Sequence, residues 1–142
     1  MQKIQVIIFR KREGELEFLL LQRRGKKDFW QGVTGGVEPS DNTIHDAAIR
    51  ELQEELVLDA RSENLIGPVY EFSFVTQRKG HEGTEATEYC FGLEVPEDTL
   101  IHLSPEHDAY QWVSFEKAVK QIAFPEPKKV LEILYAQKRS VI

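Results

Sequence analysis

The segment that most constrains the fold is a charged stretch of good helix formers over residues 44–56, which ends in the run Arg-Glu-Leu-Gln-Glu-Glu-Leu. At 100° per residue, Glu51, Glu54 and Glu55 fall within roughly a 100° sector of the predicted helix. The apolar residues of its last turns lie in a different sector: Ile49, Leu52 and Leu56. We therefore expect a helix that packs one side on a sheet and presents three carboxylates together on another.

Such a cluster of carboxylates has two interpretations. In an isolated helix the like charges of Glu51 and Glu55, four residues apart, cost a few tenths of a kcal/mol. A divalent cation would reverse that cost, and Mg²⁺ typically binds one or two carboxylates together with substrate phosphates. The alternative is a solvated acidic face on which Arg50 pairs with Glu54.

The rest of the chain predicts a mixed sheet with few helices. Runs of Val, Ile, Leu and Phe predict strands over 3–11 and 15–23 that form a hairpin, and short glycine-containing strands over 29–37. Later strands are expected near residues 68–76, 89–95 and 110–113. The segment 77–87, which is polar and contains glycine, is expected to be a mobile loop and a candidate lid.

Helix caps complete the prediction. Asn42 or Thr43 can cap the helix over 44–56, Ser114 can cap a short helix that ends near residue 122, and a last helix is expected after Pro127. Strand runs interleaved with few helices indicate an α/β protein of the mixed, α+β kind, in which helices cover one mixed sheet. We expect one domain over residues 1–142.

The charge balance excludes some partners. The chain of 142 residues has 24 acidic and 18 basic residues, so its net charge is −6 and its pI is about 5.3. An acidic surface disfavours extended nucleic acid and anionic membranes. The single Cys90 is predicted to be a buried core thiol, which fits the cytoplasm. Residues 1–10 read as a strand rather than a signal peptide, and no apolar stretch is long enough to span a membrane.

The acidic helix and its surroundings resemble the signature of the Nudix hydrolases. That signature reads Gly, five residues, Glu, seven residues, Arg-Glu, an apolar residue, any residue, Glu-Glu, any residue, Gly and an apolar residue. Seven of its nine specified positions match over residues 36–58. The departures are Asn42, where the first Glu belongs unless Asp41 takes its place, and Val57, where the late Gly belongs. Val57 is tolerable if no positive φ is required there.

The resemblance extends beyond this signature, which we call the box, to most of residues 4–113. The segments 21–24 and 28–35 look like those that precede the box in bacterial dATP or dihydroneopterin triphosphate pyrophosphatases, and 106–112 resembles their later glutamate segment. The resemblance implies an αβα sandwich that hydrolyses a nucleoside diphosphate linked to another group. It also implies Mg²⁺, with Mn²⁺ as a substitute, because a bound divalent cation inverts the field of an acidic site and stabilises charge on phosphoryl oxygens.

The resemblance also implies roles for individual residues. Glu51, Glu55 and Glu106 would ligate Mg²⁺, Glu54 would ligate a further ion or accept a proton from the attacking water, and Arg50 would orient a carboxylate. Gly35 and Gly36 would let the backbone approach metal or phosphate closely.

Other residues near the box have competing interpretations. Arg23 and Arg24 are candidates for phosphate contact, because a guanidinium matches phosphate oxygens, and are otherwise surface charges. Trp30 would stack on a base or pterin, or else pack in the core. The histidines show no ligand spacing and are expected to be solvated: His45, His81, His102 and His107.

The leading hypothesis is a Mg²⁺-dependent pyrophosphohydrolase that converts a nucleoside triphosphate-like substrate, of the dATP or dihydroneopterin triphosphate type, to a monophosphate and pyrophosphate. A second reading keeps the chemistry and changes the substrate to an oxidised nucleotide, a dinucleoside polyphosphate, a nucleotide sugar or ADP-ribose. A third is a non-catalytic module that senses a nucleotide. The expected partner in each case is a small nucleotide or pterin polyphosphate, bound by a monomer or homodimer.

Overall fold

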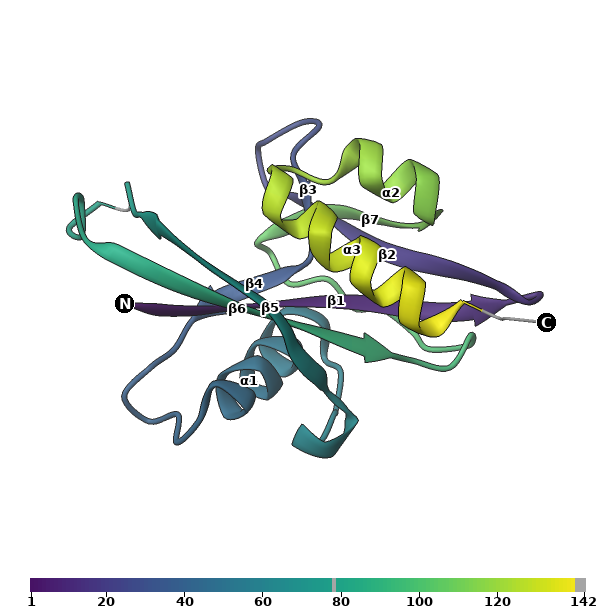
Figure 1. Ribbon diagram of the computed structural model, residues 1–142, viewed down its shortest axis with the longest axis horizontal. Helices are drawn as coiled ribbons and strands as arrows, with labels where there is room; N and C mark the ends of the chain where they lie inside the picture. Colours follow the sequence, from purple (N-terminus) through teal and green to yellow (C-terminus); the bar gives the residue numbers. More distant parts are fainter. Residues whose placement is uncertain (78, 140–142) are drawn as a thin grey trace.

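The computed structural model describes residues 1–77 and 79–139, and its framework is one mixed β-sheet with helices on both faces (Figure 1). The elements follow one another as β1 (Gln2–Arg12), β2 (Glu15–Arg23), β3 (Trp30–Gln31), β4 (Val33–Gly36), α1 (Ile44–Leu56), the 3-10 helix η1 (Ser62–Asn64), β5 (Ile66–Val75), β6 (Glu85–Glu94), β7 (His107–Ser114), α2 (Phe115–Gln121) and α3 (Pro125–Lys138). Within the described residues, the helices are all too short or too polar to cross a membrane.

The first hairpin shapes the sheet. Its turn residues Glu13 and Gly14 have φ values of 51° and 79°, as a two-residue loop that matches the strand twist requires. β1 pairs with β2 only next to this turn, through residues 9–12, and then pairs with β4 through residues 3–6. β2 pairs with β3 beyond this point, and along its other edge it pairs with β7. The two predicted strands thus separate beyond the hairpin, and the glycines of β4 pair with Lys3 and Ile4 near the start of β1.

The remaining strands lie on the other side of β1. β1 pairs with β6 in parallel, and β6 pairs with β5 in antiparallel, so the main order is β3-β2-β1-β6-β5. A sheet with one parallel and several antiparallel pairs confirms the predicted mixed α/β class. The hairpin of β5 and β6 extends well beyond the helices in Figure 1.

The two faces of β1 belong to two cores because successive side chains point to opposite faces. Ile4, Val6 and Ile8 pack with α1 on one face, and Ile7 and Phe9 pack with α2 and α3 on the other. Figure 1 shows α1 on one side of the sheet and α2 and α3 on the opposite side. The thiol of Cys90 is fully buried in the second core, as predicted.

Some boundaries differ from the sequence-based expectation. β6 begins at Glu85, so the last residues of the expected 77–87 loop belong to a strand that pairs with the end of β5. Arg78 of that loop lies outside the described residues. α3 begins at Pro125 rather than after Pro127, because proline suits the first helical position, where no backbone N–H is needed.

Candidate active site

The first helix is held in place by its cap and by its apolar side. The Thr43 Oγ1 atom accepts a hydrogen bond from the backbone N–H of Asp46 at 3.0 Å, so Thr43 is the N-cap. Leu52 and Leu56 are fully buried against the sheet. This packing places the Glu51 carboxylate directly over β4, where a Cβ atom on Gly35 would overlap it. Glycine at 35 is therefore required by the approach of Glu51 to the strand.

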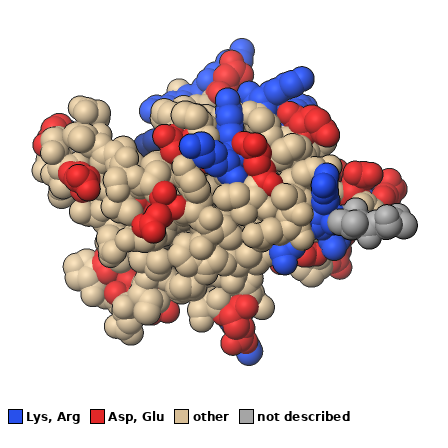
Figure 2. All heavy atoms as spheres, viewed as in Figure 1, with Lys and Arg blue, Asp and Glu red and all other residues tan. Residues whose placement is uncertain are grey.

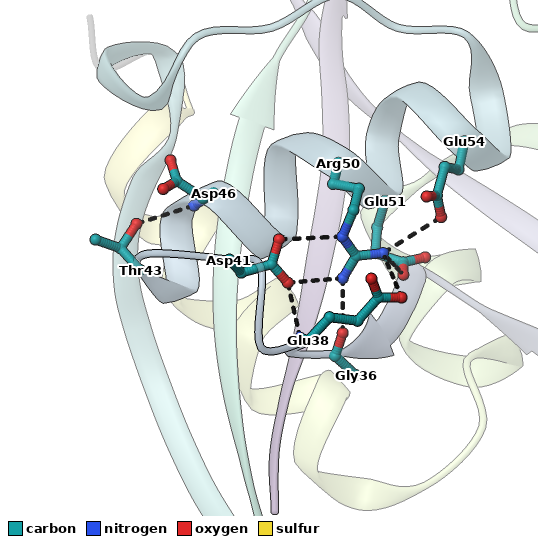
Figure 3. Close-up of polar contacts among 8 residues, drawn as sticks. All are labelled: Gly36, Glu38, Asp41, Thr43, Asp46, Arg50, Glu51 and Glu54. Atoms are coloured by element: carbon teal, nitrogen blue, oxygen red, sulfur yellow. Dashed lines mark hydrogen bonds and ion pairs between the residues drawn. The ribbon is translucent and has the colours of Figure 1, made fainter.

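Arg50 ties α1 to the loop that precedes it (Figure 3). Its Nε and Nη2 atoms donate to the two carboxylate oxygens of Asp41 at 3.1 and 2.9 Å, and Nη2 also donates to the Gly36 carbonyl at 2.8 Å. Its Nη1 atom donates to Glu51 at 2.7 Å and to Glu54 at 3.3 Å. The hydrogen bond from Arg50 lowers the pKa of Asp41. One guanidinium thus positions the glycine strand, the loop and two carboxylates of the helix.

Glu55 is the buried member of the carboxylate cluster. Its side chain is 3% exposed, and its Oε2 atom has no hydrogen-bond partner among the described residues. Burial, followed by the neighbouring carboxylates of Glu106, Glu51 and Glu54, raises the pKa of Glu55 to about 9. Burial also raises the pKa of Glu51, against the effect of Arg50. A buried carboxylate among other carboxylates is an environment that a cation would stabilise.

His107 corrects the expectation that all four histidines are solvated. It is 7% exposed, and its Nε2 atom lies 3.6 Å from Oε1 of Glu55. Burial lowers the pKa of His107, and neither ring nitrogen finds a hydrogen bond in the described part of the chain. His45 is also partly covered, since its ring contacts Phe91 edge-on. Both rings were misjudged because their burial depends on elements distant in sequence.

A cavity of about 960 Å³ brings together groups from α1, from β4 and from the segment before β7. Glu51 and Glu55 of α1, Gly35 and Gly36 of β4, and Glu106 line it. Glu106 itself is exposed and precedes β7, and its carbonyl accepts a hydrogen bond from the Arg24 backbone N–H at 2.8 Å. The structure therefore gathers three of the four predicted carboxylates around one space.

Basic side chains line the same cavity. They come from the sheet, from the segment after β2 and from the loop after β5: Lys3, Arg23, Arg24, Lys26 and Lys79. Elsewhere on the surface, Figure 2 shows Lys and Arg side chains crowded over α2 and α3, with acidic side chains spread more widely. The net charge of −6 is thus unevenly distributed, and carboxylates and basic side chains line the same cavity.

Two predicted residues lie away from the cavity wall. Glu54 is 57% exposed on α1 and pairs with Arg50. Trp30 packs, partly buried, against the core under α2 and α3, while its neighbour Gln31 lines the cavity. Sequence reasoning missed Lys3 and His107. The alternation along a strand that starts at residue 107 is the one signal that would have indicated an inward-facing His107.

Val57 departs from the expected geometry. It ends α1 with φ 55° and ψ 38°, and its backbone N–H donates to the carbonyls of Gln53 and Leu52. Position 57, where the Nudix signature has glycine, therefore does require a positive φ. Valine was expected to be tolerated only if no positive φ was needed, so that expectation was wrong. Its side chain is 57% exposed, so packing does not compensate the strain of a β-branched residue in this conformation.

The residues present suit a hard divalent cation. Oxygen ligands are available on Glu51, Glu55 and Glu106, and the partnerless Oε2 atom of Glu55 is the clearest candidate. Over residues 1–77 and 79–139, no three His, Cys, Asp or Glu side chains are already arranged as a metal site.

Known proteins share both the sequence and the fold. The NUDIX domain profile matches residues 1–134. Dihydroneopterin triphosphate diphosphatase from Escherichia coli K12 is 39% identical over 102 residues, which cover 67% of this chain and 67% of that protein. The asymmetrical bis(5'-nucleosyl)-tetraphosphatase of Sus scrofa is 32% identical over 134 residues, 89% of this chain and 88% of that protein. The structure of the E. coli dihydroneopterin triphosphate pyrophosphohydrolase has a TM-score of 0.80 and 30% identity, and the match covers 96% of this chain and 95% of that one.

Proposed function

Since the chain belongs to the NUDIX family, we propose that it is a Mg²⁺-dependent enzyme that cleaves a nucleoside or pterin triphosphate to a monophosphate and pyrophosphate. The family, the fold and the pyrophosphohydrolase class expected from the sequence are confirmed by these comparisons. The metal and the substrate are the parts that we propose.

The observation that carries the proposal is that carboxylates and basic side chains line one cavity. Glu55 lies buried beside Glu51 and Glu106, while five basic residues line the same space. A polyphosphate is repelled by carboxylates and attracted by lysines and arginines, so it fits this cavity when a divalent cation lies between its phosphates and the carboxylates. Such a cation would stabilise phosphoryl charge and lower the pKa of water.

The residues around the cavity would have different roles in hydrolysis. Glu51, Glu55 and Glu106 would hold the cation, and Arg50 would keep Glu51 and the β4 carbonyls in position. Arg23 and Arg24 would bind the outer phosphates through their guanidinium groups. Glu54 would hold a further ion or accept the proton that the attacking water loses. The water oxygen forms the new bond to phosphorus, and the anhydride oxygen leaves with pyrophosphate.

A dinucleoside polyphosphate is the second candidate substrate. The Sus scrofa relative, whose name states this activity, matches a larger share of this chain than the E. coli relative does. The chemistry would be the same, and only the group beyond the phosphates would differ. A nucleotide-sensing role without hydrolysis is the remaining alternative. We also propose that residues 1–142 act as one cytoplasmic domain, as a monomer or homodimer.

The test is a substrate panel with the purified protein. Dihydroneopterin triphosphate, dATP, GTP, oxidised dGTP, diadenosine tetraphosphate and ADP-ribose would be incubated with Mg²⁺, with Mn²⁺ and with EDTA, and both products would be quantified by chromatography. We expect equimolar monophosphate and pyrophosphate from a triphosphate, only in the presence of metal. Hydrolysis in EDTA would refute the metal dependence, and no hydrolysis of any compound would favour the sensing role.

A further inference from the structure

A second cavity, of about 320 Å³, opens from the first on the α3 face of the sheet. Six residues line both cavities: Lys3, Arg23, Gln31, Thr34, Phe74 and Phe124. The two spaces are therefore continuous around the edge of the sheet near β4. A substrate whose phosphates lie beside Glu51 and Glu55 would extend its other end into this second cavity, which we call the ring pocket.

The walls of the ring pocket are aromatic. Phe72 and Phe74 of β5 lie with ring centroids 5.8 Å apart on one side. Phe29, before β3, and Phe124, before α3, meet edge-on at 5.7 Å and also line the pocket. Phe124 is 66% exposed, so its ring is accessible to a ligand in the pocket. Aromatic faces of this kind stack on planar heterocycles.

The floor of the ring pocket is polar and buried. Gln5 is 2% exposed and Glu88 is 6% exposed, and both line the pocket. The Gln5 Nε2 atom donates to Oε2 of Glu88 at 2.7 Å, and the Gly32 backbone N–H donates to Oε1 of Gln5 at 3.4 Å. The two hydrogen bonds fix which end of the Gln5 amide faces Glu88. The Glu88 carboxylate is thereby held in one orientation.

The strand register places the charges and rings around Glu88. Phe72 lies opposite Glu88 across β5 and β6, and Lys3 lies opposite it across β1 and β6, so the three side chains share one face. Burial raises the pKa of Glu88, whereas its hydrogen bond from Gln5 and the charge of Lys3 oppose that rise. A buried carboxylate is costly unless its oxygens find donors. Gln5 supplies one donor, and a ligand in the pocket would supply others.

On the basis of the proposed function, we propose that Glu88, oriented by Gln5 at the end of the aromatic ring pocket, selects substrates whose ring presents two adjacent N–H donors. Guanine and pterin share this edge, which consists of a 2-amino group and the adjacent ring N–H, and a carboxylate accepts hydrogen bonds from both. Adenine presents one amino group beside a ring nitrogen lone pair, which an ionised carboxylate repels. Glu88 is thus a specificity-determining residue for the ring.

The test compares GTP, ITP and ATP, because ITP differs from GTP only in lacking the 2-amino group. We expect kcat/KM for GTP and for dihydroneopterin triphosphate to exceed that for ITP and ATP by about 10–100-fold, the effect of losing a hydrogen bond to a charged group. In Glu88→Gln, the GTP to ITP ratio should fall close to one. The GTP to ATP ratio should also shift towards ATP, because an amide pairs well with adenine.

Two control variants test whether the ring preference depends on Glu88 rather than on another carboxylate. Glu71→Gln changes an exposed carboxylate on β5 and should leave all ratios unchanged. Glu126→Gln changes the other carboxylate that lines the ring pocket, and a loss of guanine preference there instead of in Glu88→Gln would overturn the assignment. If Glu88→Gln does not fold, a wild-type ratio of GTP to ITP close to one would still refute the proposal, and a high ratio that Glu126→Gln leaves unchanged would support it.

Binding without hydrolysis separates this proposal from the function on which it rests. GMP, IMP and AMP would be titrated calorimetrically into the protein in EDTA. If no triphosphate is hydrolysed, the proposed function fails, and tighter binding of GMP than of IMP and AMP would still support ring selection by Glu88. If all triphosphates are hydrolysed with equal kcat/KM, the proposed function stands and the selection by Glu88 is refuted.

Discussion

The Nε2 atom of His107 lies 3.6 Å from Oε1 of Glu55, and this contact joins the start of β7 to the last turn of α1. Both side chains are buried. Burial raises the pKa of Glu55 to about 9 and lowers that of His107, so without a cation both groups are neutral near pH 7. A cation at Glu55 would change the charge of this contact and would link metal binding to the packing of β7 on α1.

The stability of the metal-free protein should fall as the pH rises. The pKa of Glu55 is about 9 in the folded chain against 4.5 for an ordinary glutamate, so between these values the folded state holds a proton that the unfolded state has released. The stabilisation is therefore complete below about pH 4.5 and is lost as the pH rises towards 9. We expect the Tm measured in EDTA to decrease by several degrees from about pH 6 to about pH 9. In Glu55→Gln the Tm should depend less on pH. If the Tm of the variant fell with pH as steeply as that of the wild type, the pH dependence would arise from other titratable groups.

Glu55→Gln should nearly abolish turnover while preserving the fold. The amide keeps the volume of the side chain but removes a negatively charged ligand, so we expect kcat to drop by on the order of 10²–10³ or more. In EDTA at about pH 8 the variant should be at least as stable as the wild type, because no carboxylate must lose its proton in a buried site. Glu63→Gln, on the exposed η1, serves as the matched control. Wild-type turnover by Glu55→Gln at saturating Mg²⁺ would refute the ligand role.

Glu106→Ala should weaken metal binding more than it weakens chemistry. The carboxylate is exposed and lines the cavity near Glu55, so we expect the Mg²⁺ concentration for half-maximal activity to rise about tenfold or more. The increase in Tm that Mg²⁺ produces should also shrink, which measures binding independently of activity. Glu116→Ala, an exposed carboxylate on α2, is the control. An unchanged Mg²⁺ dependence would remove Glu106 from the ligand set.

Val57→Gly should stabilise the protein. Valine at φ 55° carries strain of about 1–2 kcal/mol, and glycine relieves it at the expense of about 0.4–1 kcal/mol of extra chain entropy in the unfolded state. Little packing is lost because the side chain is 57% exposed. We expect unfolding in urea to require about 1 kcal/mol more free energy, with kcat unchanged. As a comparison, Leu58→Gly changes the next residue, which is buried, and should destabilise the protein. If Val57→Gly were less stable than the wild type, the proposed backbone strain at Val57 would be refuted.

Local signals in the sequence were sufficient for α1. Its observed bounds, Ile44–Leu56, match the prediction because the Thr43 cap, the charged helix formers and the apolar side all lie within that segment. The first hairpin was predictable for the same reason. The start of β6 was not, because residues 85–87 are polar or small and become a strand only through pairing with the end of β5.

Residue spacing along the chain was enough to indicate the family, the mixed sheet, the acidic helix and polyphosphate chemistry, since these depend on neighbours along the chain. Three contacts became visible only once the distant elements were packed: Asp41 contacts Arg50, His107 is buried against Glu55, and Glu88 and Gln5 form the floor of an aromatic pocket. Each of these depends on which strand or helix covers which face, and burial of a polar side chain is set by those distant partners rather than by its own type.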